Sequence, residues 1–225
     1  MKVGVIKILN DENSEVRLRA VSALEKIGDI RVVEFFINSL NDDNIGIQTV
    51  GAEALGLIGN KRAVDPLIKV LVDKKSPAIV RKGAAMSLGW LGDKRGCKPL
   101  INALKDEGNE NRRAAAWALG KIADIKAVGP LIELLNDKDS FVRKSSAGAL
   151  GEIKDKRAVG DLVKLLNDQV NYVRAEAARA LGDIGDTRAM EPLVLALEDS
   201  DDIVQGIASQ AIEKIKETEH SDTGL

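Results

Sequence analysis

The sequence predicts an all-α fold, a solenoid of seven helix-turn-helix repeats, and three observations support this prediction. The phrase RAVDPLIKVL at residues 62–71 returns as KAVGPLIELL at 126–135 and as RAVGDLVKLL at 157–166. One position recurs in steps of 31, 33, 31, 31, 31 and 31 residues, at Arg17, Gln48, Arg81, Arg112, Arg143, Arg174 and Gln205. The composition is 44% hydrophobic but only 3% aromatic, which suits helices packed through small aliphatic side chains. A fixed period of about 20–50 residues indicates a repeat architecture.

The repeats define a single solenoid domain over residues 1–216. Its units span about residues 1–28, 29–59, 60–92, 93–123, 124–154, 155–185 and 186–216, and a polar C-terminal tail follows at 217–225. A two-residue insertion in the loop at 73–78 explains the single step of 33.

Each unit is expected to contain two helices. The first, such as Arg62–Val72, has apolar residues at helical spacing and a proline near its start, as at Pro66. The second, such as Tyr172–Ile184, follows a polar turn. We expect the side chains at the turn to cap the second helix; they are Ser14, Asn109, Ser140, Asn171 and Asp202. A glycine past the last turn is expected to be left-handed, at Gly28, Gly92 and Gly185.

Two charged positions recur along the repeats. The inter-helix turn carries Asp11, Asp42, Asp73, Asp106, Asp137, Asp168 and Asp199. Six residues later stand Arg17, Arg81, Arg112, Arg143 and Arg174, with glutamine in the other two units. A turn carboxylate can cap the next helix and pair with an arginine of the same or the adjacent unit. We therefore interpret both positions as a structural ladder, and not as catalytic carboxylates or a cation site.

These motifs resemble HEAT repeats, in the class of phycobilisome-lyase subunits. Pro130 in the first helix, Asp137 in the turn and Val142-Arg143 early in the second helix carry the resemblance. It covers about 216 of 225 residues, and Gln48 and Gln205 depart from it. The resemblance implies a right-handed α-solenoid whose second helices line the concave side. It implies little about chemistry, since the family consists mostly of interaction scaffolds, and we expect a scaffold with no enzymatic activity.

A helical wheel at 100° per residue selects the candidate binding residues. Positions one, two, five and nine after the arginine position lie opposite the buried stripe, and both tryptophans fall there, in adjacent units. We expect a partner-binding surface on the concave face, formed by Val50, Leu57, Lys82, Met86, Trp90, Arg113, Trp117, Lys121 and Lys144. Exposed aromatic patches mark binding surfaces, and the basic residues favour a protein or peptide of acidic and apolar character. Alternatively, the rings cover gaps left by glycine and alanine.

Other classes of function find less support. One cysteine, and one histidine at His220, make a disulfide framework, a metal site or a histidine base improbable, and no cofactor or metal is expected. The net charge of −2 argues against a nucleic-acid binder. Neither a signal peptide nor a membrane span is recognised, so a cytoplasmic location is expected. Two alternatives stay open, a bilin lyase-like subunit or chaperone assisting tetrapyrrole attachment, and a HEAT-like nucleic-acid enzyme.

Overall fold

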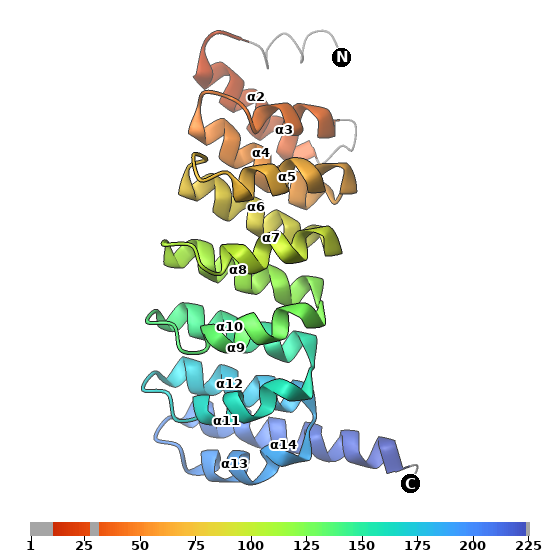
Figure 1. Cartoon of the computed structure of the whole chain (residues 1–225), viewed down its shortest axis with the longest axis vertical. Coiled ribbons are helices and arrows are strands. Elements are labelled where there is room, and N and C mark those ends of the chain that lie inside the picture. Colours follow the sequence, from red (N-terminus) through yellow and green to blue (C-terminus); the bar gives the residue numbers. More distant parts are fainter. Residues whose placement is uncertain (1–10, 28–31, 224–225) are drawn as a thin grey trace. The chain divides into compact units, whose positions relative to one another are not determined.

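The protein is built of helices arranged in pairs (Figure 1). The computed structural model describes residues 11–27 and 32–223, with side chains described for 11–20 and 32–219. Within these residues all regular structure is helical, which confirms the all-α prediction. The first helices are α3 (Val33–Ser39), α5 (Val64–Val72), α7 (Cys97–Ala103), α9 (Val128–Leu134), α11 (Val159–Leu165) and α13 (Met190–Leu195). The second helices are α2 (Ser14–Ile27), α4 (Ile45–Ile58), α6 (Ala78–Leu91), α8 (Asn109–Ile122), α10 (Ser140–Ile153), α12 (Asn171–Ile184) and α14 (Asp202–Thr223).

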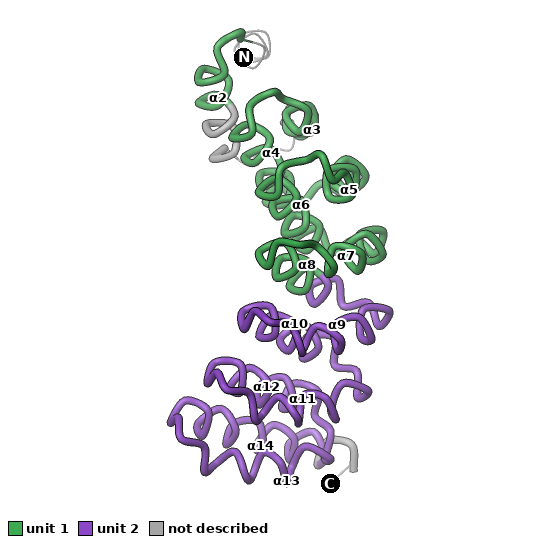
Figure 2. Tube along the Cα trace, turned by 60° about the vertical axis from the view of Figure 1, so that its left-hand side comes forward, with its two compact units in different colours: residues 1–118 green, residues 119–225 purple. Residues whose placement is uncertain are grey.

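The chain forms two compact units, Met1–Ala118 and Leu119–Leu225 (Figure 2). In unit 1, α4 packs on α6, and the first helices α3 and α5 pack on the second helices of their own repeats, α4 and α6. In unit 2, α12 lies between α10 and α14 and contacts both. Helices that contact their own pair and the neighbouring repeat form an α-solenoid.

A 3-10 turn precedes most first helices, which the sequence did not predict. The expected helix Arg62–Val72 is divided into the 3-10 turn η2 (Lys61–Ala63) and α5. The equivalent turns are η3 (Lys94–Gly96), η4 (Ile125–Ala127), η5 (Lys156–Ala158) and η6 (Thr187–Ala189). A side chain caps each turn, as at η3, where the Asp93 carboxylate accepts a hydrogen bond from the Arg95 N–H at 3.0 Å. A further 3-10 turn, η7 (Ala196–Glu198), follows α13.

The caps of several second helices lie one residue earlier than expected. The Asp139 carboxylate accepts hydrogen bonds from the N–H groups of Phe141 and Val142 at 3.0 and 3.1 Å, and so caps α10. Asp201 caps α14 in the same way, since its carboxylate accepts hydrogen bonds from the N–H groups of Ile203 and Val204. The five residues predicted as caps are instead the first residues of their helices, namely Ser14, Asn109, Ser140, Asn171 and Asp202. The prediction was wrong because a capping side chain must precede the helix to reach the N–H groups two and three residues ahead.

Glycine and alanine allow neighbouring second helices to approach closely. A Cβ atom at Gly151 would lie 2.9 Å from the Cα atom of Ala180, and one at Gly182 would lie 2.8 Å from the Cα atom of Ala211. At the helix ends, Gly92 and Gly185 have φ of 61° and 71°, which confirms the expected left-handed conformation. Gly28 lies outside the described residues.

The Asp–Arg ladder joins successive repeats. The Arg143 guanidinium donates from Nη1 to the Asp137 carbonyl of its own turn at 2.9 Å. It also donates from Nε and Nη2 to the two carboxylate oxygens of Asp168 in the next turn, at 2.6 and 2.8 Å. Arg17 and Arg174 make the same contacts. Each donates to a carbonyl oxygen of its own turn and, through two hydrogen bonds, to the aspartate of the next turn, Asp42 or Asp199. The structural role that we assigned to these residues therefore fits their geometry.

The two glutamines at the arginine position keep one part of the arginine contact. Gln48 and Gln205 keep the bond to their own turn, from Nε2 to the carbonyl oxygens of Asp42 and Asp199, both at 2.6 Å. The turn that follows Gln48 contains the two-residue insertion, and its Asp73 is exposed. Both glutamines therefore retain the contact that the arginines make with the turn of their own repeat.

The last helix continues beyond the seventh repeat. We expected a polar tail from residue 217, but α14 extends to Thr223. The side chain of His220 lies outside the described residues.

Candidate partner-binding surface

The two tryptophans contact each other across neighbouring repeats of unit 1. The ring centroids of Trp90 on α6 and Trp117 on α8 are 5.1 Å apart, with an edge-to-face angle of 64°. Trp90 is 57% exposed, whereas Trp117 is half-buried. The Trp117 ring covers Gly89, since a Cβ atom there would lie 2.8 Å from its Cζ3 atom. One ring is thus largely presented to solvent, and the other supports it while filling the space above a glycine.

The other apolar residues predicted for this surface lie on the second helices α4 and α6. Leu57 on α4 is 67% exposed, and Met86 and Val50 are half-buried. Met86 stands one helical turn before Trp90 on α6. Together with the tryptophans these residues give the second-helix face of unit 1 an apolar character, and we call Leu57, Met86, Trp90 and Trp117 the tryptophan surface.

The basic residues beside the tryptophan surface share one carboxylate. Glu110 on α8 accepts from the Lys82 Nζ atom at 2.6 Å and from the Arg113 Nη2 atom at 2.8 Å. The sequence did not indicate this pairing, because Lys82 and Glu110 are 28 residues apart. Two positive charges and one negative charge leave this cluster with one net positive charge.

The remaining predicted residues belong to unit 2. Lys121 on α8 donates to Glu152 on α10 at 2.7 Å. The Lys144 Nζ atom lies 5.9 Å from the centroid of the Tyr172 ring, within the range of a cation–π contact. Both basic side chains are therefore engaged within unit 2.

Unit 2 also contains an aromatic pair that sequence reasoning missed. Phe141 and Tyr172 stack with centroids 5.2 Å apart and planes at 18°, and the Tyr172 hydroxyl lies 2.5 Å from the hydroxyl of Ser140. Both rings stand two residues before the arginine position of their repeats. Comparing that position between repeats would have found the pair, but our wheel covered only positions after the arginine.

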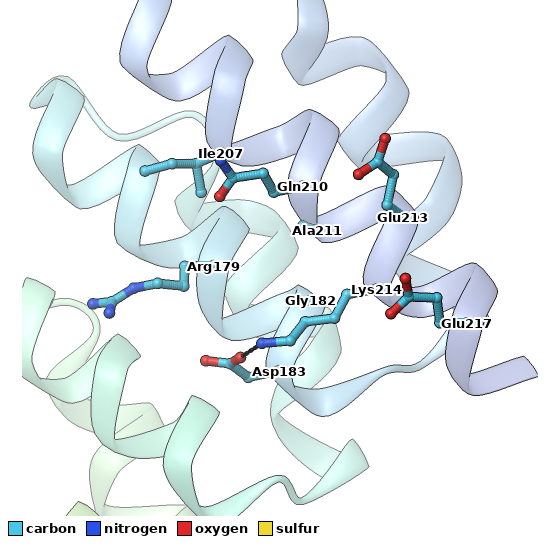
Figure 3. Close-up of a pocket in the computed structure, with 9 residues that line it drawn as sticks. All are labelled: Arg179, Gly182, Asp183, Ile207, Gln210, Ala211, Glu213, Lys214 and Glu217. Atoms are coloured by element: carbon cyan, nitrogen blue, oxygen red, sulfur yellow. Dashed lines mark hydrogen bonds and ion pairs between the residues drawn. The ribbon is translucent and has the colours of Figure 1, made fainter. Parts of the chain in front are cut away.

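A shallow depression of about 430 Å³ lies between α12 and α14 of unit 2 (Figure 3). Asp183 on α12 and Lys214 on α14 form an ion pair at 2.5 Å across it. Arg179, which also lines it, pairs with Glu176, and this hydrogen bond raises the pKa of the guanidinium. Small-molecule sites are mostly apolar, so a depression lined by ion pairs is a poor candidate for one.

Metal binding and membrane insertion each require specific structural features. No group of three or more His, Cys, Asp or Glu side chains suited to a metal ion occurs among the described residues. No helix in the described part of the chain has the length and apolar character needed to cross a membrane.

Comparisons with known proteins identify the repeat. A family model described as HEAT repeats matches residues 4–81, 66–150 and 130–213. The CpcE and CpcF complex of phycocyanin lyase from Nostoc sp. PCC7120 is 24% identical, with a TM-score of 0.62, over 94% of this chain and 93% of that chain. An engineered protein is 26% identical, with a TM-score of 0.63, over 95% of this chain and 67% of that chain.

A computationally designed armadillo repeat protein for modular peptide recognition is 21% identical, with a TM-score of 0.57, over 80% of this chain and 98% of that chain. No curated protein shows significant sequence similarity to the chain. At 24% and 21% identity, the likenesses to the lyase complex and to the armadillo protein concern the fold alone.

Proposed function

The chain belongs to the HEAT-repeat family, and we propose that it is a non-enzymatic scaffold that binds a protein segment on the tryptophan surface of unit 1. The observation that carries this proposal is the 57% exposure of Trp90, held edge-to-face by Trp117. A large apolar ring that is both exposed and held in place is typical of a binding hot spot, because little side-chain entropy remains to be lost on binding.

The partner chemistry follows from the neighbouring charges. Lys82 and Arg113 both donate to the carboxylate of Glu110, and a carboxylate of the partner would add a further negative charge beside these two basic groups. The rings and Leu57 would contact apolar side chains of the same segment. We therefore propose a peptide, a helix or a protein surface that combines acidic and apolar residues, with the charges contributing mainly to orientation and association rate.

Affinity capture from lysate, followed by quantitative mass spectrometry, tests the proposal. Trp90→Ala should weaken capture of the specific partner about 5- to 150-fold, equivalent to about 1–3 kcal/mol. Val72→Ala is the matched control, since Val72 is 55% exposed but lies on the first helix α5. Equal capture by wild type and Trp90→Ala, with only the Val72 variant impaired, would refute the tryptophan surface.

The two alternative functions can be tested on the same protein. A role in tetrapyrrole attachment predicts a change in absorbance when a bilin is mixed with the chain, and Trp90→Ala should reduce that change. A nucleic-acid enzyme needs a basic face for phosphate. The second-helix face of unit 2 instead pairs its charges, as in Lys121–Glu152 and Lys214–Asp183, which favours the protein-binding scaffold.

A further inference from the structure

The first helix of the last repeat exposes apolar side chains that earlier repeats cover. Leu197 is 39% exposed, whereas Leu135 and Leu166, which hold the same position in repeats five and six, are 3% and 8% exposed. Val194 is 49% exposed, whereas its equivalents Ile132 and Val163 are half-buried. In earlier repeats a further repeat covers this position, so Val194 and Leu197 form a surface shaped for a packed helix.

An acidic residue beside this surface has paired equivalents elsewhere in the chain. Glu34 in repeat two and Asp65 in repeat three hold the position of Glu191. Each binds an arginine in the 3-10 turn of the following repeat, Glu34 to Arg62 at 2.5 Å and Asp65 to Arg95 at 2.8 Å. Glu191 forms no ion pair within the described residues. Its position therefore matches a site that elsewhere receives an arginine from an incoming helix.

Together these features define a docking surface of Glu191 and Val194 on α13 and Leu197 on η7. We propose that it binds an amphipathic helix of a partner protein, one that begins with an arginine and packs as the first helix of a following HEAT repeat would. The arginine would pair with Glu191, and the apolar face of the helix would cover Val194 and Leu197. At the equivalent positions, Glu34–Arg62 and Asp65–Arg95, the ion pair is exposed to solvent, and such a pair contributes little free energy. The ion pair would therefore set the register and orientation of the helix, while burial of apolar side chains would provide most of the affinity.

The charge around α13 favours a basic partner over a second α13. Glu191, Glu198 and Asp202 form no ion pairs within the described residues, and all three are exposed. Two copies meeting through α13 would bring these carboxylates together, and like charges brought together at an interface oppose association. A helix that carries arginine or lysine at its start supplies the opposite charge.

The proposal can be tested with a peptide of known sequence. The probe is the acetylated and amidated peptide of residues 60–72, NKRAVDPLIKVLV, which contains η2 and α5 and presents Arg62. Methyl NMR spectra of the isotope-labelled full chain detect binding even at millimolar affinity. Titration should shift the methyl signals of Val194 and Leu197 in a saturable way.

Variants of both molecules identify the contacts. Val194→Asn should weaken the peptide about tenfold, and Glu191→Gln about two- to fivefold. A peptide with Arg62→Gln should bind wild type as weakly as Glu191→Gln binds the original peptide, and combining the two changes should add little further loss. Ile125→Asn is the control, because Ile125 is 63% exposed and belongs to unit 2 but lies in η4, two repeats before α13. It should bind with unchanged affinity.

Three outcomes would overturn the proposal. The first is methyl shifts at Val163 and Leu195, in the groove between α11 and α13, without shifts at Val194. The second is that Glu191→Gln weakens binding of the original peptide and of the Arg62→Gln peptide by the same factor. The third is self-association of the chain alone in sedimentation, abolished by Val194→Asn, which would make a second copy the occupant. The surface lies in unit 2, so Trp90→Ala should leave peptide binding unchanged, and this proposal can fail separately from the scaffold function.

Discussion

Arg143 and Asp168 are 25 residues apart, and two parallel hydrogen bonds of 2.6 and 2.8 Å join them. Both side chains are almost fully buried. Arg143 also bonds the carbonyl oxygen of Asp137, so one guanidinium fixes the turn of its own repeat and the turn of the next. One side chain thereby links two consecutive turns of unit 2.

Breaking this pair should destabilise the protein strongly. Arg143→Ala leaves the Asp168 carboxylate without its partner and should lower the free energy of unfolding by about 3 kcal/mol. Arg143→Gln should cost less, about 1–2 kcal/mol, because glutamine keeps the bond to its own turn, as Gln48 and Gln205 do. Urea denaturation followed by circular dichroism measures both. The exposed pair Lys164–Asp161 is the control, and Lys164→Ala should change stability by less than about 0.5 kcal/mol.

Stability should fall in acid as the ladder aspartates are protonated. Burial alone would raise the pKa of Asp168, but the hydrogen bonds from Arg143 hold it below its ordinary value. At Asp199 the hydrogen bonds from Arg174 lower the pKa, and at Asp93 those from Arg95 lower it to about 2. A carboxyl with a lowered pKa in the folded state stabilises the protein above its unfolded pKa of about 3.9, and this contribution is lost as the pH falls toward the folded value.

The melting temperature should therefore decrease from about pH 5 to about pH 2. Asp168→Asn should be less stable at neutral pH and should show a weaker pH dependence, since one titrating group is removed. Melting curves across this range measure both effects. A variant with the same pH dependence as wild type would show that Asp168 does not contribute to it.

The two tryptophans should differ in their effect on stability. Trp90→Ala should lower the free energy of unfolding by less than about 1 kcal/mol, because most of its ring is exposed. Trp117→Ala should cost about 2 kcal/mol, because its ring covers Gly89 and its removal leaves a gap. Thermal melts of the single variants check this difference. A large loss for Trp90→Ala would place its ring in the core and contradict the tryptophan surface.

Two glycines should respond to alanine in opposite directions. Gly151→Ala places a Cβ atom 2.9 Å from the Ala180 backbone and should destabilise by about 1–3 kcal/mol. Gly160→Ala, in α11, meets nothing within 4 Å and should stabilise by about 0.5 kcal/mol, because alanine reduces the entropy of the unfolded chain. Chemical denaturation of both variants tests the prediction. Similar effects in both would mean that helix propensity, and not close approach, determines the response.

The repeat period was sufficient to predict the fold. One spacing of about 31 residues locates the inter-helix turns, the apolar face of each helix and the aspartates and arginines of the ladder. Local signals were less exact. Asp139, not Ser140, caps α10, since both types of residue are good caps and only geometry chooses between them. The 3-10 turns were also missed, because the Arg-Ala pairs in them, such as Arg62-Ala63, fit an α-helix as well as a 3-10 turn.

The candidate surface could be predicted only in part. Helical spacing placed Trp90 and Trp117 on corresponding faces of neighbouring repeats, but it could not show that Trp117 supports Trp90 over Gly89. The pairing of Lys82 with Glu110 depends on side chains of different repeats, and their spacing of 28 residues is not a multiple of the period. Such contacts follow from packing between helices, which a one-dimensional pattern does not contain.

The close approach of Gly151 to Ala180 and of Gly182 to Ala211 acts over a longer range than its own contact. Each helix pair takes its direction from the pair before it, so a methyl group inserted at Gly151 would tilt every later helix of unit 2 by a common angle. The displacement that a small rotation causes increases with distance from the site of the rotation. The position of the side chains on α14 therefore depends on residue 151 being a glycine, with a hydrogen atom in place of a Cβ atom.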